Sequence, residues 1–421
     1  MSEWKEYKLG EIAEIIPGFA FKSKEFGKIG ELVIKIKDIN PPYIILSAME
    51  RVDTSSYPKD KLGKYKLAKG DFVVAMTGAT IGKVGKLKTD VLAYINQRVA
   101  KIKAKNCVCN DFIYYSISTE QFQAFIRNNI DSNTAQENIS AISIGKFPIL
   151  LPPLPEQKAI AAILSSLDDK IDLLHRQNST LEKMAETLFR QWFVERESLN
   201  YDSNDFYDGH EFKNQGNQPN QKNQGSDNVE ETKEEWEEGT LGDVIEIYDN
   251  LRVPLSKMER DKKKDGQLYP YYGAAQIMDY INDYIFDGEY ILLGEDGTVR
   301  TDEGYPVLQY ATGKFWVNNH THVIRAKQPY NNFFIWNYLK KKNIDEIVTG
   351  AVQPKINQAN LKSIDFPKYP ENLVIEFNKI SELFFKKINQ NKTQIRTLTA
   401  LRDTLLPKLM SGEVRVNNDF E

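Results

Sequence analysis

The chain repeats itself, and this internal repeat restricts its possible folds more than any other feature of its 421 residues. Residues 4–15, "WKEYKLGEIAEI", match residues 236–247, "WEEGTLGDVIEI", at an offset of 232. Three later segments match in the same order at similar offsets: "KGDFVVAMTGATIG" with "DGEYILLGEDGTVR", "NQRVAKIKAK" with "NNHTHVIRAK", and "TAQENIS" with "AVQPKIN". Self-similarity at a long, nearly constant period indicates a duplicated structural unit, here of roughly 200 residues.

Each half begins with strand and turn patterns and ends with a helical one. Short β-branched and aromatic runs such as "ELVIKIKDI", "DFVVAM", "EYILLG" and "FWVNNHTHVIRA" are punctuated by Gly, Asn, Asp and Pro. This texture is typical of strands joined by turns. A long apolar periodicity then follows in both halves. The sequence therefore predicts an α+β chain, in which two mixed α/β domains alternate with two long helices.

Both helical segments carry apolar residues at alternating spacings of four and three. The positions with this spacing are Ile160, Leu164, Leu167, Ile171, Leu174, Asn178, Leu181 and Leu188 in the first helix, and Phe384, Ile388, Asn391, Ile395, Leu398 and Leu405 in the second. A seam of period 3.5 predicts packing against a partner helix. A helix of some 40 residues is roughly 60 Å long at 1.5 Å per residue, which exceeds one domain of this size. Pro407 is expected to end the second helix near Leu406.

The charge of the chain is unevenly distributed. The formal net charge is −4, yet residues 1–155 carry +6 and residues 240–370 carry −1, while residues 195–239 carry −9. That acidic segment is rich in Asn, Gln, Gly and Glu and poor in apolar residues, so it is predicted to be a linker. The expected boundaries are 1–155 and 236–370 for the two domains, 156–196 for the first helix, 197–235 for the linker, and 371–421 for the second helix with a C-terminal tail.

Cysteine, histidine and hydropathy patterns exclude several classes of protein. Cys107 and Cys109 cannot complete a four-ligand zinc site, and the chain has only four histidines, so no metal site is predicted. The apolar runs are short and broken by charge, so neither a signal peptide nor a membrane span is expected. The sequence favours a cytoplasmic protein.

Two longer stretches resemble a known family. "LPPLPEQKAIAAILSSLDDKIDLLHRQNSTLEKMAETLFRQWF" resembles the first central region of the specificity subunit of type I restriction-modification systems, and "YPYYGAAQIMDYINDYIFDGEYILLGEDGTV" resembles one of its target recognition domains. The resemblance covers nearly the whole chain. It implies that each domain reads one half of a bipartite double-stranded DNA site and that the two helices pair antiparallel as a spacer. It also implies a non-catalytic subunit, on which two modification subunits holding S-adenosylmethionine methylate adenine, and which restriction subunits using ATP and Mg can join.

One motif suggests catalysis instead. Asn40-Pro41-Pro42-Tyr43 spells the tetrapeptide with which amino-methyltransferases hold a target adenine. Such an enzyme also needs a glycine-rich turn that opens a helix beside the cofactor. The glycine clusters at 78–85 and 293–298 lie inside the repeat, and no helical pattern follows either one. The tetrapeptide is therefore interpreted as a turn.

Side-chain chemistry and position in the repeat indicate candidate DNA contacts. Phosphates are bound by Lys, Arg and backbone N–H groups, whereas base edges are read by Arg, amides, hydroxyls and carboxylates. The candidates in the first domain are Thr77, Thr80, Lys83, Lys86, Gln97, Arg98, Gln136 and Asn138. Those in the second domain are Tyr271, Tyr272, Glu295, Asp296, Thr298, Arg300, Asn319, His320, Gln353 and Lys355. For the two tyrosines, packing in the core is an equal alternative.

Three other functions stay open at this stage. A modification-only assembly would use the same specificity subunit without a nuclease. A methyltransferase acting through Asn40 would bind cofactor on the isolated chain. A coiled-coil scaffold would bind protein through its mixed domains and would not recognise a bipartite DNA site.

Overall fold

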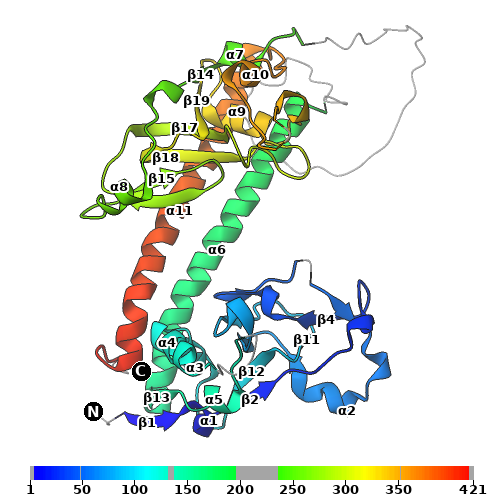
Figure 1. The fold of residues 1–421 in the computed structure, drawn as a ribbon, viewed down its shortest axis with the longest axis vertical. Helices are drawn as coiled ribbons and strands as arrows, with labels where there is room; N and C mark the ends of the chain where they lie inside the picture. The colour runs from blue at the N-terminus through cyan, green and yellow to red at the C-terminus, as the bar shows by residue number, and fades with distance from the viewer. Residues whose placement is uncertain (1–3, 48, 131–136, 196–235, 351, 417–421) are drawn as a thin grey trace, which may run out of the picture. The chain divides into compact units, whose positions relative to one another are not determined.

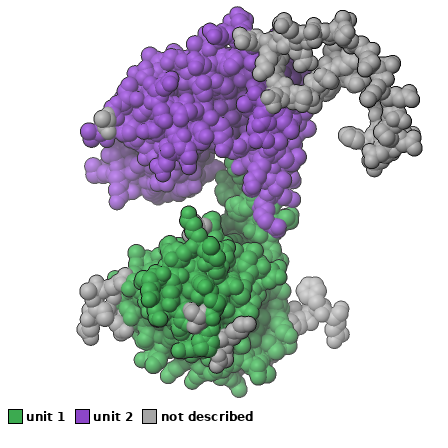
Figure 2. All heavy atoms as spheres, turned by 90° about the vertical axis from the view of Figure 1, so that its right-hand side faces the viewer, with its two compact units in different colours: residues 1–175, 392–421 green, residues 176–391 purple. Residues whose placement is uncertain are grey.

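The computed structural model describes residues 4–47, 49–130, 137–195, 236–350 and 352–416. The predicted linker, residues 197–235, lies outside this described part. Contacts divide the chain into two compact units, coloured separately in Figure 2. The first unit contains residues 1–175 and 392–421, and the second contains residues 176–391. None of the described helices is long and apolar enough to cross a membrane.

Both units share the two long helices labelled in Figure 1, α6 (Leu154–Phe193) and α11 (Glu371–Ser411). The unit boundaries fall inside these helices, so each unit combines a mixed α/β body with one end of α6 and one end of α11. The predicted helices are therefore present, with α6 starting two residues earlier than expected.

The body of the first unit is built on a six-stranded sheet. Its strand order is β2 (Ala13–Pro17), β12 (Val99–Ala104), β9 (Phe72–Ala75), β10 (Val84–Lys86), β6 (Tyr43–Ile44) and β5 (Ile39–Asn40). All neighbouring pairs are antiparallel except β10 with β6, which is parallel. One sheet face packs on α3 (Asn110–Ile117) and α4 (Glu120–Asn128), where Phe72, Ile102 and Phe112 are fully buried.

The second unit repeats this sheet. Its order is β14 (Ile245–Ile247), β19 (Thr321–Ala326), β17 (Phe286–Gly294), β18 (Leu308–Val317), β15 (Tyr269–Tyr272) and β16 (Ile277–Ile281). Here too the fourth and fifth strands, β18 and β15, are parallel and the other neighbours are antiparallel. Helix α9 (Asn332–Leu339) follows β19 as α3 follows β12. The duplication read from the sequence is a duplication of topology.

Short helices mark the same places in both units. Leu9 opens α1 (Leu9–Ile12) and Leu241 opens α7 (Leu241–Val244), and both leucines are fully buried. Likewise α5 (Ala141–Ile144) precedes α6 in the first unit, and α10 (Gln358–Lys362) precedes α11 in the second. Beside them, β1 (Lys5–Lys8) pairs with β13 (Pro148–Leu151), and two isolated bridges, Glu237 with Lys368 and Thr240 with Asp365, take their place in the second unit.

The first unit carries an additional sheet. Its order is β3 (Phe26–Gly27), β7 (Arg51–Val52), β4 (Glu31–Ile34), β11 (Ala93–Ile95) and β8 (Lys66–Leu67), with α2 (Lys59–Leu62) beside it. We call this five-stranded sheet the inserted sheet. The described residues of the second unit form a single sheet, with the short helix α8 (Lys257–Asp261) preceding β15. The repeat is thus extended in the first unit.

Within each unit, α6 and α11 pack antiparallel. In the second unit Asn391 donates to Asn178 at 2.9 Å. Phe189, eleven residues after Asn178, meets Phe377, fourteen residues before Asn391, with ring centroids 5.6 Å apart. Asn391 is fully buried and its Oδ1 has no partner among the described atoms. A pair of amides on the seam specifies one register of the helices at a cost in stability.

The remaining seam positions are placed as follows. Ile160, Leu164, Ile171, Leu174 and Ile388 are buried, whereas Leu167, Leu181, Leu188, Phe384, Ile395, Leu398 and Leu405 are half-buried. In the first unit Asp168 is buried beside Leu167, where it accepts from the Tyr115 hydroxyl at 2.8 Å and pairs with Arg402 at 2.9 Å. The sequence pattern did not indicate this buried ionic group.

The prediction that Pro407 ends the second helix is wrong. Helix α11 continues through Pro407 to Ser411. Proline lacks the N–H that would bond back to the preceding turn, and its ring crowds that turn. The last turn is held by packing instead, because Leu409 is 2% exposed in the core of the first unit and Met410 packs against the same cluster. Tertiary contacts therefore outweigh the local preference here.

Candidate nucleic-acid interface

Three loops of the first unit meet at one place. They are the β9–β10 loop, the turn between β11 and β12, and the segment that leads into α5. Backbone hydrogen bonds join them: Met76 N–H donates to Arg98 O at 2.9 Å, Gly78 N–H to Glu137 O at 3.0 Å, and Ile139 N–H to Met76 O at 3.0 Å. We call these three joined loops the three-loop edge.

The second unit builds the same three-loop edge. Its loops are the β17–β18 loop, the turn between β18 and β19, and the segment that leads into α10. Glu295 N–H donates to His320 O at 2.9 Å, Gly297 N–H to Pro354 O at 3.0 Å, and Ile356 N–H to Glu295 O at 2.8 Å. The hydrogen bonds correspond one for one, so Glu295 takes the place of Met76 and His320 takes the place of Arg98.

Most of the candidates in the first unit lie on its three-loop edge. Lys83, Gln97 and Arg98 are exposed, and Thr80 and Asn138 are half-buried. Thr77 is only 9% exposed, and the hydroxyls of Thr77 and Thr80 have no hydrogen-bond partner among the described atoms. Gln136 lies outside the described residues.

Lys86 does not lie on this edge. It belongs to β10 and forms an ion pair with Asp111 at 2.7 Å, with its ammonium 5.1 Å from the centre of the Tyr114 ring. Its side chain is 16% exposed. A DNA contact at Lys86 stays a prediction. Its acidic partner comes from the adjacent helix α3, which the loop pattern did not reveal.

In the second unit several charged candidates are paired with neighbouring side chains. Asp296 lies 2.5 Å from Nδ1 of His320, Lys355 lies 3.5 Å from Glu295, and Arg300 forms an ion pair with Asp345. Thr298, Asn319 and Gln353 are exposed without being part of these pairs. The edge of the second unit therefore carries carboxylates that are already paired with neighbouring side chains.

Tyr271 is a core residue, and its prediction as a DNA contact is wrong. It is 1% exposed and packs with Ile281 and Trp316. Its hydroxyl accepts from Leu255 N–H at 3.0 Å. Tyr272 is half-buried with its ring edge-on to Phe315, and burial raises its pKa to about 12. The alternative of core packing holds for Tyr271, and a DNA contact at Tyr272 stays a prediction.

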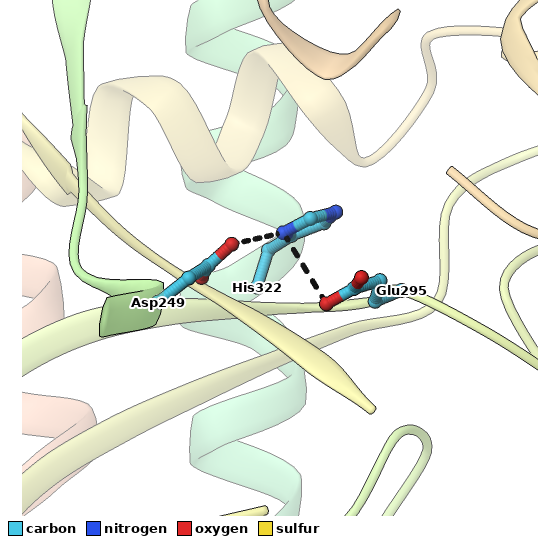
Figure 3. Close-up of side chains that lie close together, drawn as sticks. All are labelled: Asp249, Glu295 and His322. Atoms are coloured by element: carbon cyan, nitrogen blue, oxygen red, sulfur yellow. Dashed lines mark hydrogen bonds and ion pairs between the residues drawn. The ribbon is translucent and has the colours of Figure 1, made fainter. Parts of the chain in front are cut away.

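A charged cluster lies under the edge of the second unit (Figure 3). Asp249, at the start of a short 3-10 helix (Asp249–Leu251), faces His322 of β19, with Oδ2 2.6 Å from Nδ1. The other ring nitrogen, Nε2, lies 2.8 Å from the carbonyl oxygen of Ile356. His322 is fully buried. It thus joins β19 to the segment that carries Gln353 and Lys355.

The cluster contains further cations and donors. Asp249 also accepts from Val323 N–H at 2.9 Å and from the Gln358 amide at 2.7 Å. Arg252 donates to Glu295 at 2.6 Å and to the carbonyl of Thr321 at 2.7 Å. Burial alone would raise the pKa of Asp249, but the hydrogen bond and charge of His322 and the bond from Val323 hold it below its usual range. Asp249 is therefore ionised.

The side chains of Asp249, Glu295 and His322 are of types that bind metals, and their oxygen and nitrogen atoms lie within 4.8 Å of one another. They do not fit a metal site. Nε2 faces a carbonyl oxygen and must carry a hydrogen, and Nδ1 faces an ionised carboxylate, so neither nitrogen offers a lone pair. Arg252 already supplies positive charge to both acids. The arrangement is a buried ion network that fastens the loops.

Among the described residues of the first unit, this network has no counterpart. Met76 takes the place of Glu295, and the repeat offset puts Ala100 in the place of His322. Ala100 is fully buried and Met76 is 8% exposed. The same scaffold position is thus apolar in one unit and ionic in the other, which no pattern in the sequence had indicated.

The Asn40-Pro41-Pro42-Tyr43 tetrapeptide forms a turn, as interpreted. Asn40 lies on β5 opposite Tyr43 on β6. The carbonyl of Pro42 accepts from Lys86 N–H at 3.0 Å and from the Tyr114 hydroxyl at 3.1 Å. Lys88 lies 4.4 Å from the centre of the Tyr43 ring. These bonds tie the tetrapeptide to the sheet as a connection between two strands.

The glycine clusters also belong to the three-loop edges. Gly78–Thr80 is a single 3-10 turn followed by β10, and residues 293–298 run from the end of β17 into a loop. Neither cluster opens an α-helix, so the strand-turn-helix geometry of a nucleotide cofactor site is not formed at either one.

Known proteins place this architecture in a class that recognises DNA. The family described as "Type I restriction modification DNA specificity domain" matches residues 1–183 and again residues 233–375. Each match contains one mixed α/β body. The first match extends into α6, and the second ends in the first turns of α11. The chain belongs to this family.

Individual relatives agree with this assignment. The type I restriction enzyme MjaIX specificity subunit of Methanocaldococcus jannaschii is 26% identical over 98% of this chain and 94% of its own length. The S.HindORF215P protein of Haemophilus influenzae is 38% identical, but over 33% of this chain and 35% of its own length. The crystal structure of a type I S subunit from M. genitalium has the same fold, with a TM-score of 0.59, 17% identity and coverage of 97% of this chain and 96% of that one.

Proposed function

We propose that this chain recognises a bipartite DNA sequence as the specificity subunit of a type I restriction-modification complex, with one half-site read by each unit. The observation that supports this most directly is the three-loop edge, which is built twice with matching backbone hydrogen bonds and different side chains. A fixed scaffold with variable loops provides two independent readings of DNA.

The two edges differ in how they would contact DNA. Lys83 and Arg98 of the first unit are exposed cations suited to phosphates, and Gln97 offers an amide to a base edge. In the second unit Asn319 is exposed at the place that corresponds to Gln97. The carboxylates Glu295 and Asp296 would accept from the amino groups of cytosine or adenine rather than approach phosphates.

The chemistry would be carried by partner subunits. We infer that two modification subunits holding S-adenosylmethionine methylate adenine in each half-site, and that restriction subunits using ATP and Mg join the complex. This chain would contribute recognition and spacing, not catalysis. The turn geometry of Asn40-Pro41-Pro42-Tyr43 and of the glycine clusters supports this division of labour.

The decisive experiment is methylome sequencing of a host that expresses the full chain with its modification subunits. We expect methyladenine at one motif with two defined halves and a non-specific spacer. Gln97→Ala and Asn319→Ala form a matched pair, because they remove amides from corresponding places. Each should relax one half-site by about 1–3 kcal/mol of discrimination and leave the other unchanged. Methylation without any bipartite motif would refute the proposal.

A further inference from the structure

The positive charge of the first unit is concentrated in its inserted sheet. Residues 19–69 hold eleven Lys and Arg against six Asp and Glu, a net charge of +5, and residues 1–155 carry +6 in total. Residues 240–370 of the second unit, which lacks the inserted sheet in its described part, carry −1. The insertion therefore supplies most of the charge difference between these two segments.

The inserted sheet is continuous with the three-loop edge of the first unit. Strand β11 ends at Ile95 and runs directly into the turn that carries Gln97 and Arg98. Phe19 N–H donates to Ile95 O at 2.9 Å, and Asn96 N–H donates to Ile34 O at 3.0 Å. The segments at the start and at the end of the inserted sheet are thus hydrogen-bonded beside the turn that carries Gln97 and Arg98.

Two segments of exposed lysines converge on one aromatic cluster beside this edge. Phe19 lies 5.3 Å from Tyr57 and 5.3 Å from Tyr65 between ring centroids, and Lys64 lies 4.9 Å from the centre of the Tyr65 ring. Besides Lys37, the exposed lysines of the insertion are Lys22, Lys24, Lys28, Lys61, Lys64, Lys66 and Lys69. The aromatic cluster fixes the backbone from which several of them project.

These lysines keep their charge available. Lys35 and Lys37 are held by Glu50 within the sheet. Of the other seven exposed lysines, only Lys22 has an ion pair among the described residues, with Glu25 at 3.7 Å. Glu25 is itself engaged by the Tyr57 hydroxyl. An exposed, uncompensated group of cations next to a recognition edge is suited to the regular phosphates of a duplex.

We propose that the inserted sheet binds the phosphate backbone of DNA that flanks the first half-site, and that it supplies sequence-independent affinity for the whole complex through one unit only. This inference rests on the proposed function and extends the contact surface beyond the three-loop edge. The second unit has ion pairs within its own edge and contributes base contacts. The phosphate contacts of the inserted sheet already hold the DNA when it does so.

The test measures the salt dependence of DNA binding by the full chain assembled with its modification subunits. The variant combines Lys22→Gln, Lys24→Gln and Lys64→Gln. The probe duplex extends one helical turn, about 10 base pairs, beyond the first half-site. Each lost phosphate contact lowers the slope of log K against log salt by about 0.9, so three lost contacts lower it by about 2.7. On a duplex trimmed at the half-site, variant and unchanged complex should give equal slopes.

A charge-matched control combines Lys5→Gln, Lys8→Gln and Lys158→Gln, which are exposed on β1 and the first turns of α6. It should keep the original slope on both duplexes. Methylome sequencing of the lysine variant should return the same bases in both half-sites. Equal slopes for variant and unchanged complex on the long duplex would overturn the inference, as would altered bases in the motif.

Two other results separate the possible failures. If the lysine variant no longer retains its modification subunits while its slope stays the same, the surface serves a protein partner and the inference is wrong. If the unchanged complex methylates no bipartite motif, the proposed function fails before the lysines are considered. Equal thermal unfolding temperatures for both variants would show that the fold is intact.

Discussion

Replacing His322 by alanine should destabilise the second unit more than any exposed substitution. The imidazole is fully buried and bonded on both sides, to the Asp249 carboxylate at 2.6 Å and to the carbonyl of Ile356 at 2.8 Å. Alanine leaves Asp249 as a buried anion with Arg252 as its nearest remaining cation, at 3.6 Å, and leaves the carbonyl without its donor. Removing one partner of a buried pair costs about 3–5 kcal/mol.

The assay is urea unfolding of the full chain, followed by hydrogen exchange resolved by peptide. We expect lower protection from hydrogen exchange in the peptide that contains Ile356, because its carbonyl loses the bond to His322. We expect the same in the peptide that contains Glu295, because Arg252, which bonds Glu295, belongs to the same buried network. The sheet of the first unit should keep its protection. His175 on α6 is exposed, so His175→Ala is the matched control and should change the free energy of unfolding by less than about 0.5 kcal/mol.

The same variant should weaken recognition in one half-site. His322 fastens the segment that carries Gln353 and Lys355 without reaching the surface, so its loss should lower methylation of the second half-site and leave the bases of the first unchanged. A loss of less than about 1 kcal/mol in stability, or equal effects on both half-sites, would refute the reasoning from the buried network.

Three further predictions concern single contacts. The pKa of Asp249 is lowered in the folded state, so its contribution to stability is complete above the ordinary value of 3.8 and is lost as the pH falls below that value. His322 causes part of this lowering. Acid should therefore reduce the urea midpoint of the second unit less in His322→Ala than in the unchanged chain. Asn391→Leu should cost about 1–3 kcal/mol by stranding Asn178, whereas the double replacement of both amides by Leu should be nearly neutral or stabilising, as a double-mutant cycle would show. Tyr271→Phe should cost about 1 kcal/mol through the lost bond to Leu255 and leave the methylated motif unchanged, and a changed motif would restore Tyr271 as a DNA contact.

The features that were predictable from the sequence are those that recur locally. The duplication, the strand texture and the two long helices depend on periods of two, of three to four, and of roughly 200 residues, each of which is visible along the chain. Asn178 and Asn391 were recognisable as polar members of the seam, and they bond one another in the structure. Such periodicity predicts helices and strands because residues at each period of an element face the same surroundings.

The errors arose where distant segments decide the environment. Tyr271 is enclosed by Trp316, and Pro407 is held in the helix by the packing of Leu409. The network around His322 joins it to Asp249, 73 residues earlier, and to Ile356, 34 residues later. Neither spacing is a period of a helix or strand, so only the folded arrangement brings these groups together.

The two units also show why an ionic network can replace apolar packing only as a whole. Met76 and Ala100 fill the position under the first edge with side chains that need no hydrogen-bond partner. Glu295 and His322 at the same position in the second unit need Arg252 and Asp249 as partners. Changing Glu295 and His322 alone to Met and Ala would leave Asp249 and Arg252 buried with each other as their main partners. These two charged groups would lose the hydrogen bonds that orient them, while the free-energy cost of burying their charges would remain. Exchange of the edge between units should therefore succeed only when the segment from Asp249 to Arg252 is exchanged with it.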